Sequence, residues 1–145
     1  MLRVTEPVSP SDFEKIFDLR YRILRAPWNQ PKGSESDTDE SKCVHAMIAD
    51  EQGECIATGR LQFNSPEEAQ IRYMAVDERF RGMRLGKQIL EFLEAKALER
   101  SCRVITLQAR DNALDFYTAM GYSVAEQTFL LFGTIQHYRM TKSLG

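Results

Sequence analysis

A change of hydrophobic period in the middle of the chain constrains the fold more than any other feature. Residues Gln70–Val76 form a largely apolar run of strand length, and after a polar turn Leu85–Arg100 repeats its apolar side chains at the spacing of a helix. Another short apolar run, Val104–Ala109, then has the character of a strand. A strand, a helix and a strand in this order place the two strands parallel, with a right-handed crossover between them. The sequence therefore predicts a sheet with at least one helix packed on its face.

The segments on either side of this unit add antiparallel strands and further helices. Ala26–Ser41 holds prolines, a glycine and several acidic residues and is predicted as a loop. Ser11 or Asp12 is expected to cap the first helix. The other expected elements are a helix over Asp12–Leu24, a hairpin of strands over His45–Ala49 and Cys55–Phe63, a helix over Asn112–Met120, and closing strands over Phe129–Phe132 and Gln136–Thr141. The predicted fold class is α/β (α+β): a single domain, residues 1–145, with a central mixed, mostly antiparallel β-sheet flanked by helices.

Composition narrows the class of protein. The 145 residues have the size of one domain, and the formal net charge of -2 gives no overall attraction to nucleic acid or anionic lipid. No apolar run approaches the roughly 20 residues that a membrane-spanning helix needs. The cysteines Cys43, Cys55 and Cys102 are widely spaced and odd in number, which favours free thiols in a reducing compartment. We therefore expect a cytoplasmic protein with no metal site and no nucleic-acid or membrane partner.

The turn before the long helix has the composition of an anion site. Between Val76 and Lys87 the sequence is rich in arginine and glycine. The first amides of a helix lack internal partners and the helix dipole favours an anion there, while Gly82 and Gly86 let a phosphate or another backbone approach closely. The turn therefore predicts a pyrophosphate site, with a solvated basic turn as the alternative. Neither GxxxxGK[ST] nor GxGxxG is present, so the turn is not a P-loop or a Rossmann fingerprint.

Two motifs give the chain a resemblance to a known family. Arg81-Gly82-Met83-Arg84-Leu85-Gly86 resembles the acetyl-coenzyme A pyrophosphate loop of the GNAT superfamily of N-acetyltransferases, whose pattern is Gln/Arg-x-x-Gly-x-Gly/Ala. One strand later, Asn112–Tyr122 resembles the family's Asn-x-x-Ala-x-x-Phe-Tyr-x-x-x-Gly-Phe segment, with the alanine shifted. A weaker similarity to the ElaA-like branch comes from Leu19–Arg25, from His45 and from Gly133–Met140. The order of the predicted elements fits the family along most of the chain.

The resemblance implies acetyl-coenzyme A (acetyl-CoA) as co-substrate and direct attack on its thioester by a primary amine of a small molecule or peptide. It also implies that a backbone amide of Met74–Val76 donates to the thioester carbonyl, and that Tyr117 acts as general acid toward the leaving thiolate. The residues that the resemblance assigns to cofactor binding are Met74, Ala75, Val76, Arg81, Gly82, Met83, Arg84, Leu85, Gly86, Lys87 and Asn112.

Several roles stay open on the sequence alone. Arg84 stands where the family motif most often has its first glycine, and we expect a helical conformation there, because a left-handed one would strain an arginine. Asn112 could touch the cofactor or cap a helix. Gln70–Val76 lacks the glutamate that many family members carry on this strand. The base that takes the amine proton could therefore be a histidine, with His45 the first candidate and His137 the second, or a water.

The acceptor is the part that the sequence determines least. The acidic run over Glu35–Glu40 could attract a cationic amine or form a solvated loop, whereas Arg25 and Arg60 could hold a carboxylate of the acceptor. Trp28 could cover the acceptor cleft or anchor its loop. Two rival functions are a non-catalytic acyl-CoA-binding sensor or scaffold, and a nucleic-acid or phosphoprotein binder that uses the basic turn. An edge strand near the C-terminus could pair two copies into a homodimer.

Overall fold

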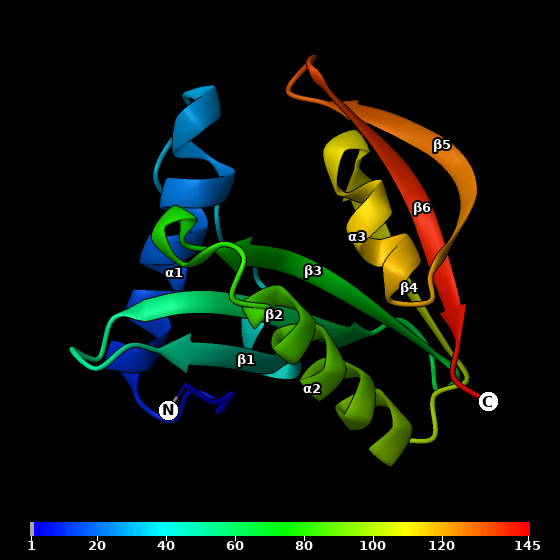
Figure 1. Ribbon diagram of the computed structural model, residues 1–145, viewed down its shortest axis with the longest axis horizontal. Helices are drawn as coiled ribbons and strands as arrows, with labels where there is room; N and C mark the ends of the chain where they lie inside the picture. The colour runs from blue at the N-terminus through cyan, green and yellow to red at the C-terminus, as the bar shows by residue number, and fades with distance from the viewer. Residues whose placement is uncertain (1) are drawn as a thin grey trace.

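Six strands form one mixed sheet in the order β1-β2-β3-β4-β6-β5 (Figure 1), in a computed structural model that describes residues 2–145. The strands are β1 (Val44–Ala49), β2 (Cys55–Phe63), β3 (Glu68–Val76), β4 (Val104–Arg110), β5 (Ser123–Leu131) and β6 (Ile135–Ser143). The helices are α1 (Pro10–Leu24), α2 (Leu85–Glu99) and α3 (Leu114–Ala119), with 3-10 turns η1 (Ala26–Trp28), η2 (Glu40–Lys42), η3 (Glu78–Phe80) and η4 (Asp111–Ala113). None of the described helices is both long and apolar enough to cross a membrane.

The parallel pair predicted from the central unit is confirmed. β3 and β4 run parallel, with Glu68 opposite Val104 and Ile71 opposite Leu107. The other neighbouring strands of the described sheet pair antiparallel. The prediction of a mixed, mostly antiparallel sheet flanked by helices is therefore confirmed, and α2 is the crossover between the parallel strands (Figure 1).

The two longer helices cover opposite faces of the sheet. Helix α2 buries Leu85, Ile89, Leu90, Leu93 and Ala97 in the larger core cluster, as its periodicity predicts. Gly59 of β2 permits this close approach, because a Cβ atom there would lie 2.7 Å from Cγ2 of Ile89. Helix α1 buries Ile16 and Leu19 in a second cluster with residues of β1, β2 and β3. Each fully buried leucine or isoleucine contributes about 1.5–3 kcal/mol relative to an exposed one.

The start of α1 differs from the prediction of Ser11 or Asp12 as the cap. Ser9 is the cap: its side-chain oxygen accepts from the backbone amide of Asp12 at 3.1 Å, and the Asp12 carboxylate accepts from the amide of Ser9 at 3.3 Å. Pro10 occupies the first helical turn, where its missing N–H costs nothing. The helix therefore begins two residues earlier than the apolar face alone indicates.

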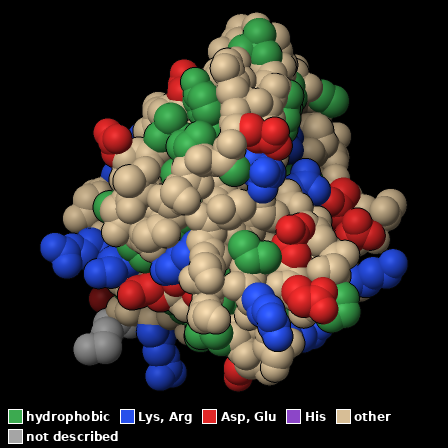
Figure 2. Space-filling view, turned by 90° about the vertical axis from the view of Figure 1, so that its right-hand side faces the viewer, with side chains coloured by type: hydrophobic (Ala, Val, Ile, Leu, Met, Phe, Trp, Pro, Cys, Tyr) green, Lys and Arg blue, Asp and Glu red, His purple; other side chains and the backbone are tan. Residues whose placement is uncertain are grey.

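The closing hairpin is longer than its apolar residues predict. β5 begins at Ser123 and β6 ends at Ser143, whereas the sequence marks only the segments around Phe129–Phe132 and Gln136–Thr141. β5 is the edge strand and is exposed along most of its length, so its polar residues give no alternating pattern. The side of the molecule that carries this hairpin shows acidic and basic side chains interspersed with apolar ones (Figure 2). Pairing of β5 with a second copy stays a prediction.

Candidate active site

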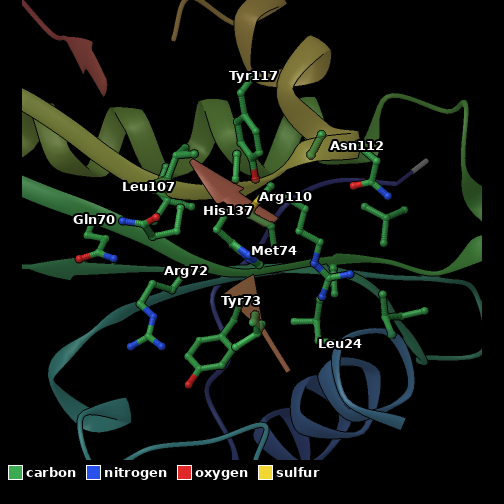
Figure 3. Close-up of a pocket in the computed structure, with 18 of the residues that line it drawn as sticks. Leu24, Gln70, Arg72, Tyr73, Met74, Leu107, Arg110, Asn112, Tyr117 and His137 are labelled. Carbon is green, nitrogen blue, oxygen red and sulfur yellow. The ribbon is translucent and has the colours of Figure 1, made fainter. Parts of the chain in front are cut away.

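The site is a cleft that opens where β3 and β4 separate. The two strands pair only from Glu68–Ile71 and Val104–Leu107, although β3 continues to Val76 and β4 to Arg110. Past the last pair a cleft of about 710 Å³ lies between them, and residues from α1, α3, β5 and β6 complete its walls (Figure 3). Residues 72–76 therefore present backbone that has no partner in β4.

A bulge at Tyr73 shapes the β3 side of this cleft. Thr58 faces Ala75 and Arg60 faces Arg72, so Gly59 alone stands opposite two residues of β3. Tyr73 has the positive φ of 57°, a left-handed conformation that costs a tyrosine about 1–3 kcal/mol and persists where the surrounding structure enforces it. The extra residue breaks the alternation of β3: Met74 packs with the α2 cluster, while Tyr73 packs with the α1 cluster. The strain thus directs the aromatic ring toward the α1 side of the cleft.

The turn after β3 leads to an uncapped helix N-terminus. Gly82 and Arg84 have φ of 85° and 61°, and no side chain caps α2 at Arg84. The expected helical conformation at Arg84 is therefore wrong, and the arginine occupies the left-handed region that a glycine would adopt without strain. The first helical hydrogen bond runs from the amide of Gln88 to the carbonyl of Arg84 at 3.2 Å. The preceding amides at the start of the helix stay available to an anion.

One of the four cations around this turn is already neutralised. Arg79 donates to both carboxylate oxygens of Asp77, at 3.1 and 3.0 Å, and the Asp77 carboxylate is buried. Hydrogen bonds from Arg79 lower the pKa of Asp77 to about 2. Arg81, Arg84 and Lys87 are exposed and form no ion pair with any residue in 2–145. These three cations therefore lie beside the free amides of the helix, the arrangement that the predicted anion site requires.

Tyr117 and Asn112 both line the cleft. Tyr117 extends from α3 with its hydroxyl pointing into the cavity (Figure 3), and only 8% of the residue is exposed. Asn112 lies in η4, because the predicted helix over Asn112–Met120 is divided into η4 and α3. Neither η4 nor α3 has a side-chain cap. Asn112 therefore does not cap a helix, which was one of its two predicted roles. The same cleft is lined by four more of the predicted cofactor-binding residues, Met74, Ala75, Val76 and Arg81. The rest of the predicted loop, Gly82–Lys87, lies outside the lining and leads into α2.

The two histidines have different positions. His137, on β6, lines the cleft and stacks on Phe129 at 4.7 Å between ring centroids. Its Nδ1 lies 3.0 Å from the Ile135 carbonyl, so Nδ1 carries the ring proton and Nε2 keeps a lone pair. His45 lies outside the lining of the cleft, with its Nε2 2.7 Å from the carbonyl of Glu40 and its ring against Phe13. The structure therefore brings His137 to the site and places His45 elsewhere.

The acidic run has a structural partner. Arg60 is fully buried and donates to both carboxylate oxygens of Asp37, at 2.8 and 3.0 Å. Arg20 is also fully buried and donates to Glu40 at 2.9 Å. Hydrogen bonds from Arg60 lower the pKa of Asp37 to about 2. The loop therefore folds back to neutralise buried arginines, and neither carboxylate is available to a cationic acceptor.

Two cleft residues that the sequence did not single out are Arg72 and Arg110. Arg110, at the end of β4, places its guanidinium 4.5 Å from the ring centroid of Trp28. The ring centroids of Trp28 and of Phe132, in the β5–β6 turn, lie 6.3 Å apart. Trp28 therefore connects the loop after α1 with the β5–β6 side of the cleft. The position of Arg110 just before Asn112 was a signal that could have found it.

The comparisons with known proteins agree with this geometry. A model of the Acetyltransferase (GNAT) family matches residues 13–122. A Bacillus subtilis protein whose name describes it as an acetyltransferase is 26% identical over 144 residues, which cover 97% of this chain and 96% of that protein. Escherichia coli ElaA has the same fold, with a TM-score of 0.84, 20% identity and 98% and 99% of the two chains covered.

A further solved structure has this fold with the cofactor present. An aminoglycoside 6'-N-acetyltransferase complexed with coenzyme A superposes with a TM-score of 0.81 at 15% identity, over 98% of this chain and 97% of that one. The family match covers both the turn before α2 and the α3 segment, which are the two motifs that carried the resemblance in the sequence. With its split parallel strands, uncapped α2 and tyrosine-bearing α3, this chain belongs to the GNAT family of acetyltransferases.

Proposed function

We propose that this acetyltransferase moves the acetyl group of acetyl-CoA directly to a primary amine of a small molecule or peptide, with Tyr117 as general acid. Acetyl-CoA is the co-substrate of the family to which the chain belongs. The observation that carries the proposal is the placement of the Tyr117 hydroxyl, which points from α3 into the cleft toward the unpaired edge of β3 (Figure 3).

The transfer needs three contributions from the protein. The amine nitrogen bonds to the thioester carbon, negative charge gathers on the carbonyl oxygen, and the carbon–sulfur bond then breaks to release the thiolate. The backbone of Met74–Val76, without a partner in β4, supports donation to that oxygen. Burial raises the pKa of Tyr117 above the ordinary value of 10.0, so its phenol keeps a proton at neutral pH and can give it to the sulfur.

The amine must lose a proton before or during its attack. His137 is the histidine that lines the cleft, and its Nε2 has no hydrogen-bond partner in the part of the chain that the structure describes. Burial lowers the pKa of His137 below the ordinary 6.5, so the ring is neutral at pH 7 and its free nitrogen can accept a proton. These features support His137 as the base in place of His45.

The pyrophosphate of acetyl-CoA has a matching site at the other end of the cleft. Arg81 lines the cavity, and Arg84 and Lys87 follow at the uncapped start of α2. Amides at a helix N-terminus and unpaired cations bind a diphosphate by direct donation and by the helix dipole. This arrangement supports the assignment of the predicted loop to the cofactor.

A non-catalytic acyl-CoA-binding module is the alternative function. The feature that favours it is the lining of the cleft, which includes no aspartate or glutamate from the described residues, so no carboxylate is placed to act as base. A sensor of this kind would bind acetyl-CoA as an enzyme does and would release no thiol in the presence of an amine.

The test begins with isothermal titration of the protein with acetyl-CoA, coenzyme A and ATP, followed by a panel of primary amines assayed for thiol release. We expect micromolar binding of acetyl-CoA, far tighter than ATP, and amine-dependent thiol release that is lost in Tyr117→Phe. Equal binding of all three compounds would overturn the pyrophosphate site. Tight acetyl-CoA binding without turnover of any amine would favour the sensor.

A further inference from the structure

The acceptor side of the cleft has an excess of positive charge that the fold does not neutralise. The lining includes Arg25 and Arg110 on this side, Arg81 toward α2, and Arg72, whose Nη1 donates to Asp37 Oδ2 at 3.4 Å; no aspartate or glutamate of the described chain lines the cleft itself. The buried arginines nearby show the contrast, because Arg20 and Arg60 each have a carboxylate within 2.9 Å. The fold therefore provides carboxylates for Arg20, Arg60 and Arg72, whereas Arg25 and Arg110 form no ion pair with any residue in 2–145.

Arg110 is the least satisfied of these side chains. Its side chain is half-buried and makes no hydrogen bond or ion pair with any residue between 2 and 145. It extends from β4 across the cleft toward Leu24, the last residue of α1 (Figure 3). The guanidinium carbon lies 4.5 Å from the centroid of the Trp28 ring, and its N–H groups have no partner among residues 2–145, so they can bind a carboxylate or phosphate through two parallel hydrogen bonds.

Arg25 brings a second positive charge to the same place. It lies at the C-terminus of α1, where Nε donates to the carbonyl of Ser34 at 3.0 Å and Nη1 to that of Leu24 at 3.0 Å. These neutral carbonyls position the guanidinium without cancelling its charge. Burial, and then the charge of Arg25, lower the pKa of Arg110. The two guanidinium groups therefore repel each other, and an anion bound by both would offset that repulsion.

We infer that the acceptor is an anionic amine, whose carboxylate or phosphate group binds Arg110 and Arg25 while its primary amine reaches the thioester. The inference rests on the proposed function for the reaction and adds the class of substrate. An oxyanion at Arg110 would lie at the end of β4. Arg110 pairs there with His137 of β6, and Asn112 follows two residues later. The anion would thereby hold the amine end of the molecule near the candidate base.

A panel of matched amines tests this inference. It pairs α- and ω-amino acids of increasing length with their carboxamides, with the aminoalkyl phosphonates and with diamines, and it measures thiol release from acetyl-CoA. We expect kcat/KM for an acid or phosphonate to exceed that of its carboxamide by at least about tenfold, or ~1.4 kcal/mol. The acid and phosphonate arms distinguish the two kinds of anion. Preference for the carboxamides or the diamines would overturn the inference and leave the proposed acetyl transfer intact.

Variants then connect the preference to the arginine. In Arg110→Gln we expect KM for the anionic amine to rise and the acid-to-amide ratio to fall toward one, with KM for acetyl-CoA unchanged. Arg110→Lys keeps the charge but not the paired donors, so it should recover part of the ratio. Arg103→Gln removes an exposed arginine outside the cleft and serves as the matched control, with wild-type kinetics. An unchanged ratio in Arg110→Gln would overturn the role of Arg110.

A binding measurement keeps the two proposals separable. Protein saturated with coenzyme A is titrated with the N-acetyl derivatives of the same acids and carboxamides, and thermal melting confirms that each variant is folded. Binding of the N-acetyl acids that is lost in Arg110→Gln, without turnover of any amine, would support the anion site and reject the acetyl transfer. Binding of neither series, with acetyl-CoA bound normally, would reject the anion site.

Discussion

The ring of Phe116 lies 3.4 Å from the position that a Cβ atom on Gly86 would occupy. The sequence explains Gly86 by the approach of a phosphate, but in the structure a Cβ atom there would meet Phe116 of α3 and Val76 at the end of β3. The glycine therefore joins the two motifs of the family: it lets the helix after the pyrophosphate turn pack against the helix that carries Tyr117.

Because a side chain at Gly86 would meet Phe116, two variants are needed to distinguish the effect of its size from the effect of its charge. In Gly86→Asp we expect the affinity for acetyl-CoA to fall by more than about tenfold, because a carboxylate would compete with the pyrophosphate for the amides of α2. Gly86→Asn has nearly the same volume without the charge, and it should lose much less affinity. Isothermal titration of both variants measures the difference, and equal losses would assign the effect to displacement of Phe116.

Removal of the Tyr117 hydroxyl tests the general acid. In Tyr117→Phe we expect kcat to fall by roughly 10²–10⁴-fold, the usual contribution of a positioned proton donor. The hydroxyl has no hydrogen-bond partner among residues 2–145, so the variant should melt at nearly the wild-type temperature and bind acetyl-CoA normally. Thiol release at saturating amine gives kcat, and a kcat close to wild type would remove Tyr117 from the mechanism.

Arg84 combines a strained backbone with a cation at the cofactor site. Its φ of 61° costs an arginine about 1–2 kcal/mol, and a glycine adopts the same conformation freely. In Arg84→Gly we therefore expect a higher free energy of unfolding, by about 1 kcal/mol, together with weaker binding of acetyl-CoA. Arg84→Ala keeps the strain and loses the charge, so it should weaken binding without the gain in stability. Urea unfolding and isothermal titration make the comparison.

The sequence predicted the parts of the fold that depend on local pattern. The parallel pair around α2 followed from the change of period at Leu85, and the start of α2 after a turn rich in arginine and glycine followed from the same change; that this turn binds the cofactor stays a prediction. The bulge at Tyr73 could not be predicted, because a tyrosine residue gives no indication of a positive φ. The positive φ arises where Gly59 of β2 stands opposite two residues of β3. The separation of β3 from β4 that opens the cleft, and the position of His137 in it, depend on contacts between segments distant in the sequence.

The same reason explains the acidic loop. Composition describes Asp37 and Glu40 as members of a solvated acidic run, and only the folded chain places them on two buried arginines. The sequence leaves open whether the acceptor is cationic or anionic, and the partners of these two carboxylates bear on that choice. The carboxylates neutralise Arg20 and Arg60, whereas Arg25 and Arg110 stay in the cleft without an ion pair among residues 2–145, as the inferred anionic acceptor requires.

Acid should weaken the fold through Asp37. Its pKa is about 2 in the folded protein against an ordinary 3.8, with hydrogen bonds from Arg60 as the largest cause. A lowered pKa means that the carboxylate stabilises the folded state fully above about pH 4, and that this stabilisation is lost as the pH falls from 4 toward 2. In Asp37→Asn we expect a loss of about 1.5–3 kcal/mol at pH 7, typical of a hydrogen bond to a charged group.

Urea unfolding at pH 7, 4 and 3 measures both effects. The difference between wild type and Asp37→Asn should narrow below pH 4, because protonation removes the same charge as the substitution. Asp39→Asn is the matched control, since Asp39 is exposed in the same loop and its side chain accepts no hydrogen bond from a described residue. A difference that stays constant down to pH 3 would mean that the carboxylate charge does not stabilise the loop.

The pH dependence of turnover tests His137 as the base. Burial lowers its pKa below 6.5, and the nearby charge of Arg110 lowers it further, against the opposing effects of the Ile135 carbonyl and Asp111. A base is active when it is deprotonated, so kcat at saturating amine should be level near pH 7 and fall only below about pH 6.5, the unperturbed value. His137→Gln should lower kcat at pH 7 and remove this acid limb, while acetyl-CoA binding stays normal. His45→Gln provides the comparison outside the cleft and should keep the limb. Retention of the limb in His137→Gln would leave a water as the carrier of the proton.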